Sequence, residues 1–248
     1  MSSKLVLSAD PRSILASIPP RLPVRFVDER LLMWLPCDEL IGPTVHDLSG
    51  NGWDGVLKPS WPTNCPTPTL TAFSLTGLSK GRMLSFDKVD DYILVEKGRE
   101  LDLADRPFTL MIRFLLKSYP PHMGDYRIFI TKEGSFDLGI FLSSAGGTYV
   151  GFSFPGLARA GATWRPSLNE LHHVAVRRRE NLFEFFGDGV PIGGSTITYA
   201  VSSSTEPIYI GSGADLPAPG NRQHGALGDL RLYGEALSDV DIRDVAGV

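Results

Sequence analysis

The segment from Arg82 to Val95, RMLSFDKVDDYILV, constrains the fold more than any other part of the chain. Leu84 and Phe86 fall on one face of a first strand, and alternation resumes at Tyr92 after an acidic turn. Runs with this period of two build antiparallel sheets. The segment therefore predicts two short strands that are joined by a turn.

Further apolar segments of strand length follow along the chain, and Gly-rich turns separate several of them. These candidates are Leu31–Leu35, Phe108–Leu116, Arg127–Lys132, Asp137–Leu142, Tyr149–Phe154, Leu171–Arg178, Leu182–Phe186, Ile208–Ile210 and Leu227–Tyr233. The second candidate is apolar on both faces except at Thr109 and Arg113, which predicts a central strand. Regular short strands with such turns are typical of a sandwich or a barrel.

A good helix signal occurs only at the end of the chain. Ser238 can cap a helix, Asp241 has the capping-box position, and Val240, Ile242 and Val245 follow with helical spacing. Strands do not alternate with amphipathic helices, which argues against doubly wound folds and TIM barrels. We expect an all-β sandwich of two antiparallel sheets with a short C-terminal helix.

Residues 1–30 differ from the rest of the chain, because Pro11, Pro19, Pro20 and Pro23 interrupt short apolar pieces. This pattern predicts an extended arm and not a packed layer. The 248 residues exceed the commonest domain size, but all-β sandwiches of this length are often one domain. We expect an arm over 1–30, which contacts other subunits of an assembly, and one domain over 31–248.

Composition limits the classes of partner and compartment. The net charge of -4 gives no basic field for a phosphate backbone, so nucleic acid is not an expected partner. The first apolar run is interrupted at Asp10, Pro11 and Arg12, so we expect no secretory signal peptide. No apolar stretch approaches membrane-spanning length, so we expect no membrane insertion. Synthesis in the cytoplasm is expected, with a virion surface as one destination.

The cysteines of the chain are Cys37 and Cys65. Their spacing resembles neither a metal knuckle nor a redox dithiol. Two buried free thiols are the simpler expectation, and a disulfide between them remains an alternative.

Several motifs in a fixed order resemble one family. The segments Asp38–Gly52, Leu84–Val95 and Leu101–Leu110 resemble the N-terminal half of the laminin-G-like, concanavalin A-like lectin/glucanase superfamily. The second half continues with LHHVAV, FFGDGV, PIYIGS and GDLRLYGEALS. Many motifs in the right order are more specific than a single motif. The resemblance covers roughly Leu31 to Val245 and implies a jelly roll of two antiparallel sheets.

The resemblance also implies a structural calcium ion near the SGNG loop and the strand before the closing helix. The matching residues are Asp47, Asn51 and Asp229. Calcium takes about six to eight oxygen ligands, which suits a loop rich in Asp, Asn and Gly. Asp90 and Asp91 are additional acidic candidates. The alternative is that Asp47 and Asn51 only stabilise a turn through bonds to the local backbone.

Trp53, Trp61 and Trp164 fall in predicted loops. An aromatic face in a loop can stack on a sugar ring or bury into a partner, so these three are the candidate ligand-binding residues. The alternative is that the rings fill the ends of the sandwich, above all Trp53 beside the glycine-rich loop.

Glycoside hydrolysis is the enzymatic alternative, because glucanases share the sandwich and use two carboxylates that face each other across a sugar. The segment Glu100–Asp105, ELDLAD, superficially resembles the ExDxxE signature of jelly-roll glucanases, but non-enzymatic members also carry this segment. His172 and His173 are adjacent in a strand and cannot act as a pair. We interpret Arg177–Arg179 as a solvated strand end, and we expect no enzyme.

Two hypotheses of function follow. The first is a non-enzymatic, lectin-like module that recognises glycan through its loops. The second is a structural or adhesive subunit of a larger assembly, for example a phage decoration or tail protein tethered by its arm. We expect a lectin-like module bound to an assembly. The alternatives are a stand-alone carbohydrate-binding module and, less favoured, a jelly-roll glycoside hydrolase.

Overall fold

A computed structural model describes residues 28–39, 42–58, 67–70, 82–104, 106–122, 125–143, 147–154, 159–198, 202–213 and 221–247. Of the predicted arm, only residues 28–30 are therefore described. Trp61, Cys65 and Asp105 also lie outside the described residues.

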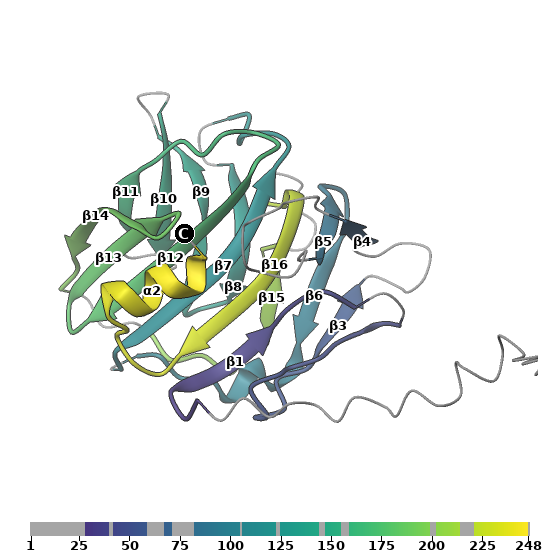
Figure 1. Ribbon diagram of the computed structural model, residues 1–248, viewed down its shortest axis with the longest axis horizontal. Helices are drawn as coiled ribbons and strands as arrows, with labels where there is room; N and C mark the ends of the chain where they lie inside the picture. Colours follow the sequence, from purple (N-terminus) through teal and green to yellow (C-terminus); the bar gives the residue numbers. More distant parts are fainter. Residues whose placement is uncertain are drawn as a thin grey trace, which may run out of the picture.

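Two antiparallel eight-stranded sheets face each other as a sandwich (Figure 1). Sheet A contains β1 (Leu31–Leu35), β4 (Thr67–Leu70), β5 (Arg82–Asp87), β7 (Phe108–Leu116), β12 (Leu171–Arg179), β13 (Leu182–Gly187), β14 (Val190–Thr196) and β16 (His224–Tyr233). Sheet B contains β2 (Thr44–Val45), β3 (Gly55–Lys58), β6 (Tyr92–Val95), β8 (Tyr126–Lys132), β9 (Phe136–Leu142), β10 (Thr148–Ser153), β11 (Arg159–Thr163) and β15 (Ile208–Ile210). The predicted all-β sandwich is confirmed.

The strand orders place long-range partners side by side. Sheet A runs β14-β13-β12-β7-β16-β5-β4, with β1 also paired to β16, and sheet B runs β11-β10-β9-β8-β15-β6-β3-β2. The two strands predicted in Arg82 to Val95 both form, but β5 belongs to sheet A and β6 to sheet B. The acidic turn between them therefore crosses from one sheet to the other.

The main core lies between the sheets, where alternate residues of each strand point inward. In sheet B these include Leu138, Ile140, Val150 and Phe152, all 0% exposed. A second apolar cluster lies on the opposite face of sheet A and includes Met111 from β7. Because β7 is covered on both faces and lies between β12 and β16, its prediction as a central strand is confirmed.

The helix α2 (Asp239–Ala246) packs over sheet A near β12 and contributes Ile242 to this second cluster (Figure 1). The hydroxyl of Ser238 accepts the Asp241 N–H at 3.1 Å, and the Asp241 carboxylate accepts the Ser238 N–H at 3.2 Å. The predicted capping box is therefore confirmed. Among the described residues no helix is long and apolar enough to cross a membrane.

The arginine run in β12 corrects one expectation, since it is not a solvated strand end. Arg177 is 2% and Arg178 is 6% exposed. Arg177 bonds to Glu184 at 2.9 Å and to Asp239 of α2 at 2.6 Å. Buried guanidinium groups need such partners, so two of the three arginines join neighbouring elements together.

Cys37 and the adjacent histidines His172 and His173 were also singled out in the sequence, and the structure shows the surroundings of each. Cys37 is a buried free thiol, and burial raises its pKa well above the usual value. His172 bonds through Nδ1 to Asp188 at 2.8 Å, whereas His173 is 4% exposed and burial lowers its pKa to about 4. His173 is therefore a neutral group inside the fold.

Candidate functional site

The predicted calcium loop is organised by the carboxylate of Asp47. Its Oδ1 accepts the backbone N–H groups of Trp34 at 2.9 Å and Ser49 at 3.0 Å. Its Oδ2 accepts the Ser49 hydroxyl at 2.7 Å and the Trp53 N–H at 2.9 Å. Four donors therefore converge on one carboxylate, which fastens the loop to β1.

Asn51 holds the same loop through different contacts. Its side-chain Nδ2 donates to the carbonyls of Leu31 and Leu32, each at 3.0 Å. Its backbone carbonyl accepts the ammonium of Lys97 at 2.6 Å, and this ammonium lies 5.4 Å from the centroid of the Trp53 ring. A lysine therefore supplies positive charge beside the loop.

Asp229 is surrounded by donors from sheet A. Its Oδ1 accepts the indole N–H of Trp34 at 2.9 Å and the Arg231 Nε at 2.8 Å. Its Oδ2 forms an ion pair with Arg113 Nε at 3.3 Å. Two guanidinium groups thus balance this carboxylate.

Asp47, Asn51 and Asp229 do not fit a shared calcium ion. Calcium needs oxygen atoms that are free to point at it, whereas these carboxylates point at N–H groups, a hydroxyl and arginines. A cation beside Asp229 would also approach two positive side chains. The contacts match the turn-stabilising alternative for Asp47 and Asn51.

The turn between β5 and β6 brings a different acidic group together. Carboxylate oxygens of Asp87, Asp90 and Asp91 lie within 4.8 Å of one another. Burial, together with the nearby charges of Asp87 and Asp90, raises the pKa of Asp91 to about 6. Asp91 accepts the Asp87 N–H at 2.9 Å, and Asp87 accepts the Val89 N–H at 2.7 Å. These bonds close the turn.

The described tryptophans from the predicted ligand set serve packing. Trp53 is 9% exposed and belongs to the main core. Trp164 packs edge-on against Phe114, with ring centroids 5.8 Å apart, and closely covers Gly187. Both rings therefore pack against the sandwich, as the packing alternative expected. Trp61 lies outside the described residues.

The segment that resembles a glucanase signature lies beside an open hollow of about 770 Å³. Leu101 and Leu103 are buried in the core, and Asp102 accepts the Ala104 N–H at 2.9 Å. The acidic residues that line the hollow are Glu100, Asp102, Glu133 and Glu206, all of them exposed. These four carboxylates thus lie at exposed positions around an open hollow and not in a buried cleft.

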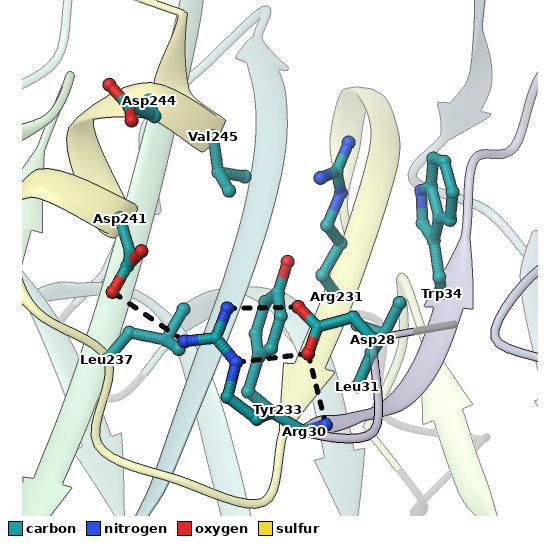
Figure 2. Close-up of a pocket in the computed structure, with 10 residues that line it drawn as sticks. All are labelled: Asp28, Arg30, Leu31, Trp34, Arg231, Tyr233, Leu237, Asp241, Asp244 and Val245. Atoms are coloured by element: carbon teal, nitrogen blue, oxygen red, sulfur yellow. Dashed lines mark hydrogen bonds and ion pairs between the residues drawn. The ribbon is translucent and has the colours of Figure 1, made fainter. Parts of the chain in front are cut away.

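A hollow of about 290 Å³ lies between β1, β16 and α2 (Figure 2). Figure 2 shows Arg30 between Asp28, to which it donates at 3.0 and 3.1 Å, and Asp241, at 3.8 Å. Arg231 lies 4.5 Å from the Trp34 ring centroid and is bonded to Asp229. The Arg30–Asp241 pair therefore joins the turn before β1 to α2, and Arg231 joins β16 to β1.

The outer face of sheet B carries a row of aromatic rings from three neighbouring strands. Tyr126 of β8 is paired in register with Phe141 of β9, and Phe141 with Tyr149 of β10. The Phe141 and Tyr149 rings are stacked, with centroids 5.5 Å apart and planes at 16°. The ring of Tyr126 meets Phe141 edge-on at 4.6 Å. We call these three residues the aromatic row.

A line of glycines beside the aromatic row gives the rings space. Gly139, Gly151 and Gly161 are paired in register across β9, β10 and β11. A Cβ on Gly151 would lie 3.0 Å from the Phe141 ring, and a Cβ on Gly161 would lie 3.1 Å from the Tyr149 ring. The rings can therefore lie against the sheet instead of standing away from it.

The backbone of Arg159 lies on the side of the glycine line opposite to the aromatic row. Its side chain crosses the glycines and covers the rings. Its guanidinium carbon lies 4.0 Å from the Phe141 centroid, 5.2 Å from that of Tyr126 and 5.7 Å from that of Tyr149. Its Nη atoms donate to the hydroxyl oxygens of both tyrosines. Phe141 is consequently only 1% exposed, whereas Arg159 is exposed and both tyrosines are partly exposed.

A hollow of about 340 Å³ opens beside Tyr149 and Arg159. Ser143 and Thr163 add hydroxyl groups to its lining, and Gly161 forms part of its floor. A concave site with aromatic faces and a few polar groups is the usual form of a small-ligand site. The aromatic row and this hollow are the candidate site of the protein.

Sequence reasoning did not identify this site, although Phe141 and Tyr149 fall inside predicted strands. Tyr126 and Arg159 fall outside the predicted strands, in β8 and β11. One signal is visible in the sequence: Phe141 and Tyr149 alternate with the core residues of their strands and so point to the opposite face of the sheet. Each of the two strands also has a glycine that belongs to this outer face. Strand register, which brings these positions together, cannot be read from the segments one at a time.

A family comparison identifies the superfamily. The family model described as the concanavalin A-like lectin/glucanases superfamily matches residues 87–243. The chain belongs to this superfamily. The resemblance expected from the sequence is therefore confirmed. No sequence among the curated proteins matches the chain.

Solved structures share the fold at low sequence identity. Domain 4 of AbnA, a GH43 extracellular arabinanase from Geobacillus stearothermophilus, in complex with arabinotriose, has a TM-score of 0.59 at 15% identity, covering 88% of this chain and 98% of that chain. Trypanosoma rangeli sialidase has a TM-score of 0.58 at 16% identity, covering 88% of this chain but 32% of the sialidase. The chain thus spans about a third of that enzyme. These likenesses concern the fold.

Proposed function

We propose that this chain is a non-catalytic glycan-binding module that binds sugar at the aromatic row and the adjoining hollow. The observation that carries the proposal is the row of aromatic rings on the outer face of sheet B, in which Tyr126 and Tyr149 are partly exposed. An aromatic ring offers an apolar surface to the C–H face of a sugar, and a tyrosine hydroxyl that accepts a bond from Arg159 can still donate its own hydrogen. The helix α2 lies on sheet A, so it does not cover this face.

Two further observations support a binding role over a hydrolytic one. The aromatic row and the described residues that line its hollow include no Asp or Glu. The acidic hollow near Glu100 has exposed carboxylates, and Asp102 is used in a local turn. Retaining and inverting glycosidases both need a pair of carboxylic groups at the sugar, and the aromatic row does not offer such a pair among described residues.

The fold neighbours are consistent with this proposal. A domain of similar extent from the arabinanase was solved in complex with arabinotriose. The match covers 98% of that domain, so one domain of the arabinanase has a similar size and fold. The proposal assigns the same general role, sugar binding, to this chain.

A glycan array tests the proposal, with the full chain applied in calcium and in chelator. We expect binding under both conditions, because Asp47 and Asp229 are occupied by protein donors. Tyr149→Ala should weaken binding about tenfold or more, which corresponds to about 1.4 kcal/mol. Tyr92→Ala is the matched control, because it also removes a tyrosine ring but from β6, which β8 and β15 separate from the aromatic row. This variant should bind as tightly as the parent.

Two outcomes would contradict the proposal. The first is an array on which the parent retains no glycan in either condition. The second is hydrolysis of a retained glycan, which would show that the module is an enzyme. Both variants should be compared by thermal melting, so that loss of binding is separated from loss of folding.

The assembly role is a separate part of the proposal and concerns residues 1–30. Pro-rich composition supports an arm that attaches the sandwich to a larger particle, for instance as a virion decoration or tail subunit. Removal of residues 1–30 should then abolish incorporation into that particle. Undiminished incorporation of the truncated chain would refute the tether.

A further inference from the structure

The positive charge of Arg159 is not paired with a carboxylate in the part of the chain that the structure describes. The ion pairs among the described residues include Arg30, Arg99, Arg113, Arg177, Arg179 and Arg231. They do not include Arg159, which is exposed. Its described partners are the two phenol hydroxyls and the three rings of the aromatic row.

The described lining of the adjoining hollow does not balance this positive charge. The described lining of the adjoining hollow contains hydroxyl groups and glycine, with Arg159 as its charged member. Asp137 belongs to the same register row as Arg159, but it lies two strands away and accepts the hydroxyls of Thr131 and Ser153. The hollow is thus locally positive in a chain whose net charge is -4.

The aromatic row holds the guanidinium in one place. Three rings contact the group, and hydrogen bonds to Tyr126 and Tyr149 fix its orientation. Two of its five N–H groups are used in this way, so others remain for a ligand. A fixed guanidinium recognises a carboxylate or a sulfate through two parallel hydrogen bonds, and less ordering entropy is lost on binding.

We infer that the site recognises an acidic glycan, with the sugar ring against Tyr149 and its anionic group paired to Arg159. This inference rests on the proposed glycan-binding function and adds the class of sugar. A carboxylate and a sulfate ester have the same chemistry toward guanidinium. Tyr149 supplies affinity for the ring, and Arg159 supplies selectivity for the charge.

The test uses the full chain and matched oligosaccharides. An array that contains neutral, uronate-containing, sialylated and sulfated glycans identifies the retained class. Titration then compares an oligogalacturonide with its methyl ester, in which a neutral methyl ester replaces each carboxylate on the same sugar chain, and with a sulfated galacto-oligosaccharide. We expect the charged member of the pair to bind at least tenfold more tightly, and this ratio should fall with added salt.

Variants of Arg159 identify the residue that recognises the charge. Arg159→Met keeps apolar cover over Phe141 but removes the charge, so it should reduce the preference for acidic glycan to less than twofold. Arg159→Lys should retain part of the preference, because it keeps charge without the planar fork. Arg243→Met, at an exposed position on α2, removes the same charge elsewhere and should leave the preference unchanged.

The outcomes separate this inference from the function on which it rests. If no glycan of any class is retained, the glycan-binding function itself is refuted. If only neutral glycans are retained, or if Arg159→Met keeps the full preference, glycan binding stands and recognition through Arg159 is refuted. Preference for the uronate or for the sulfated sugar distinguishes the two sources of the anionic group.

Discussion

Substitution of Asp47 by alanine distinguishes a carboxylate that holds a loop from one that holds a metal. In the structure this carboxylate accepts three backbone N–H groups, from Trp34, Ser49 and Trp53, and the Ser49 hydroxyl. Asp47→Ala leaves the three N–H groups without this acceptor. A hydrogen bond to a charged group contributes about 1.5–3 kcal/mol, and partial access to water favours the low end of that range.

Three such bonds at the low end, about 1.5 kcal/mol each, predict a loss of about 4–5 kcal/mol in the free energy of unfolding. Urea unfolding, followed by tryptophan fluorescence, measures this loss in chelator and in millimolar calcium. The loss should be equal in both, because the donors belong to the protein. Asp38→Ala removes an exposed carboxylate from the same region and should change stability by less than about 0.5 kcal/mol.

Two results would refute this role of Asp47. A loss below about 1 kcal/mol would show that the loop does not depend on the carboxylate. A loss that occurs in calcium but not in chelator would show that Asp47 acts as a calcium ligand. Asp47→Asn keeps one oxygen acceptor and should give an intermediate loss, which provides a second and milder variant.

Two further perturbations test particular contacts. Burial raises the pKa of Asp91 from 3.8 to about 6, so its contribution to stability is fully present below 3.8 and is lost as the pH rises through 6. Asp91→Asn should therefore gain up to about 3 kcal/mol relative to the parent between pH 4 and pH 7, and a pH-independent difference in urea unfolding would contradict this. Gly225→Ala should cost about 2–4 kcal/mol, because φ is +144° and the new Cβ would meet the Leu115 carbonyl. Gly147→Ala meets only the Ser143 hydroxyl at 3.6 Å and should be nearly neutral, and equal melting temperatures for the two variants would refute the steric argument.

The strands and the helix cap could be predicted because their signals are local. The capping box depends on Ser238 and Asp241, which are three residues apart, and β7 is apolar on both faces within one segment. Such patterns depend on the period of each element. The assignment of β5 and β6 to different sheets could not be predicted in this way, because a short alternating strand does not specify its partner.

The burial of Arg177 and Arg178 also depends on distant parts of the chain. The acceptors of Arg178 include the carbonyl of Leu103, and those of Arg177 include Asp239. A charged run in a strand gives no sign of these acceptors. The family resemblance indicates the loop around Asp47, whereas the donors to its carboxylate include Trp34 of β1 and depend on the position of that strand.

The candidate site also combines local sequence signals with contacts that depend on distant parts of the chain. Tyr126, Phe141 and Tyr149 lie in three strands and meet only through register. Tryptophan in a loop is the stronger sequence signal for sugar binding, but Trp53 and Trp164 are used in packing. The aromatic row combines weaker signals, namely outward aromatic residues and glycines in matching phase.

Hydrogen exchange with and without a retained glycan tests the location of binding most directly. If sugar binds at the aromatic row, backbone amides of β10 and β11 around Tyr149 and Gly161 should exchange more slowly in the complex. The amides of β1 and α2, beside the hollow in Figure 2, should be unchanged. Protection at β1 and α2, with none at β10 and β11, would contradict glycan binding on the outer face of sheet B.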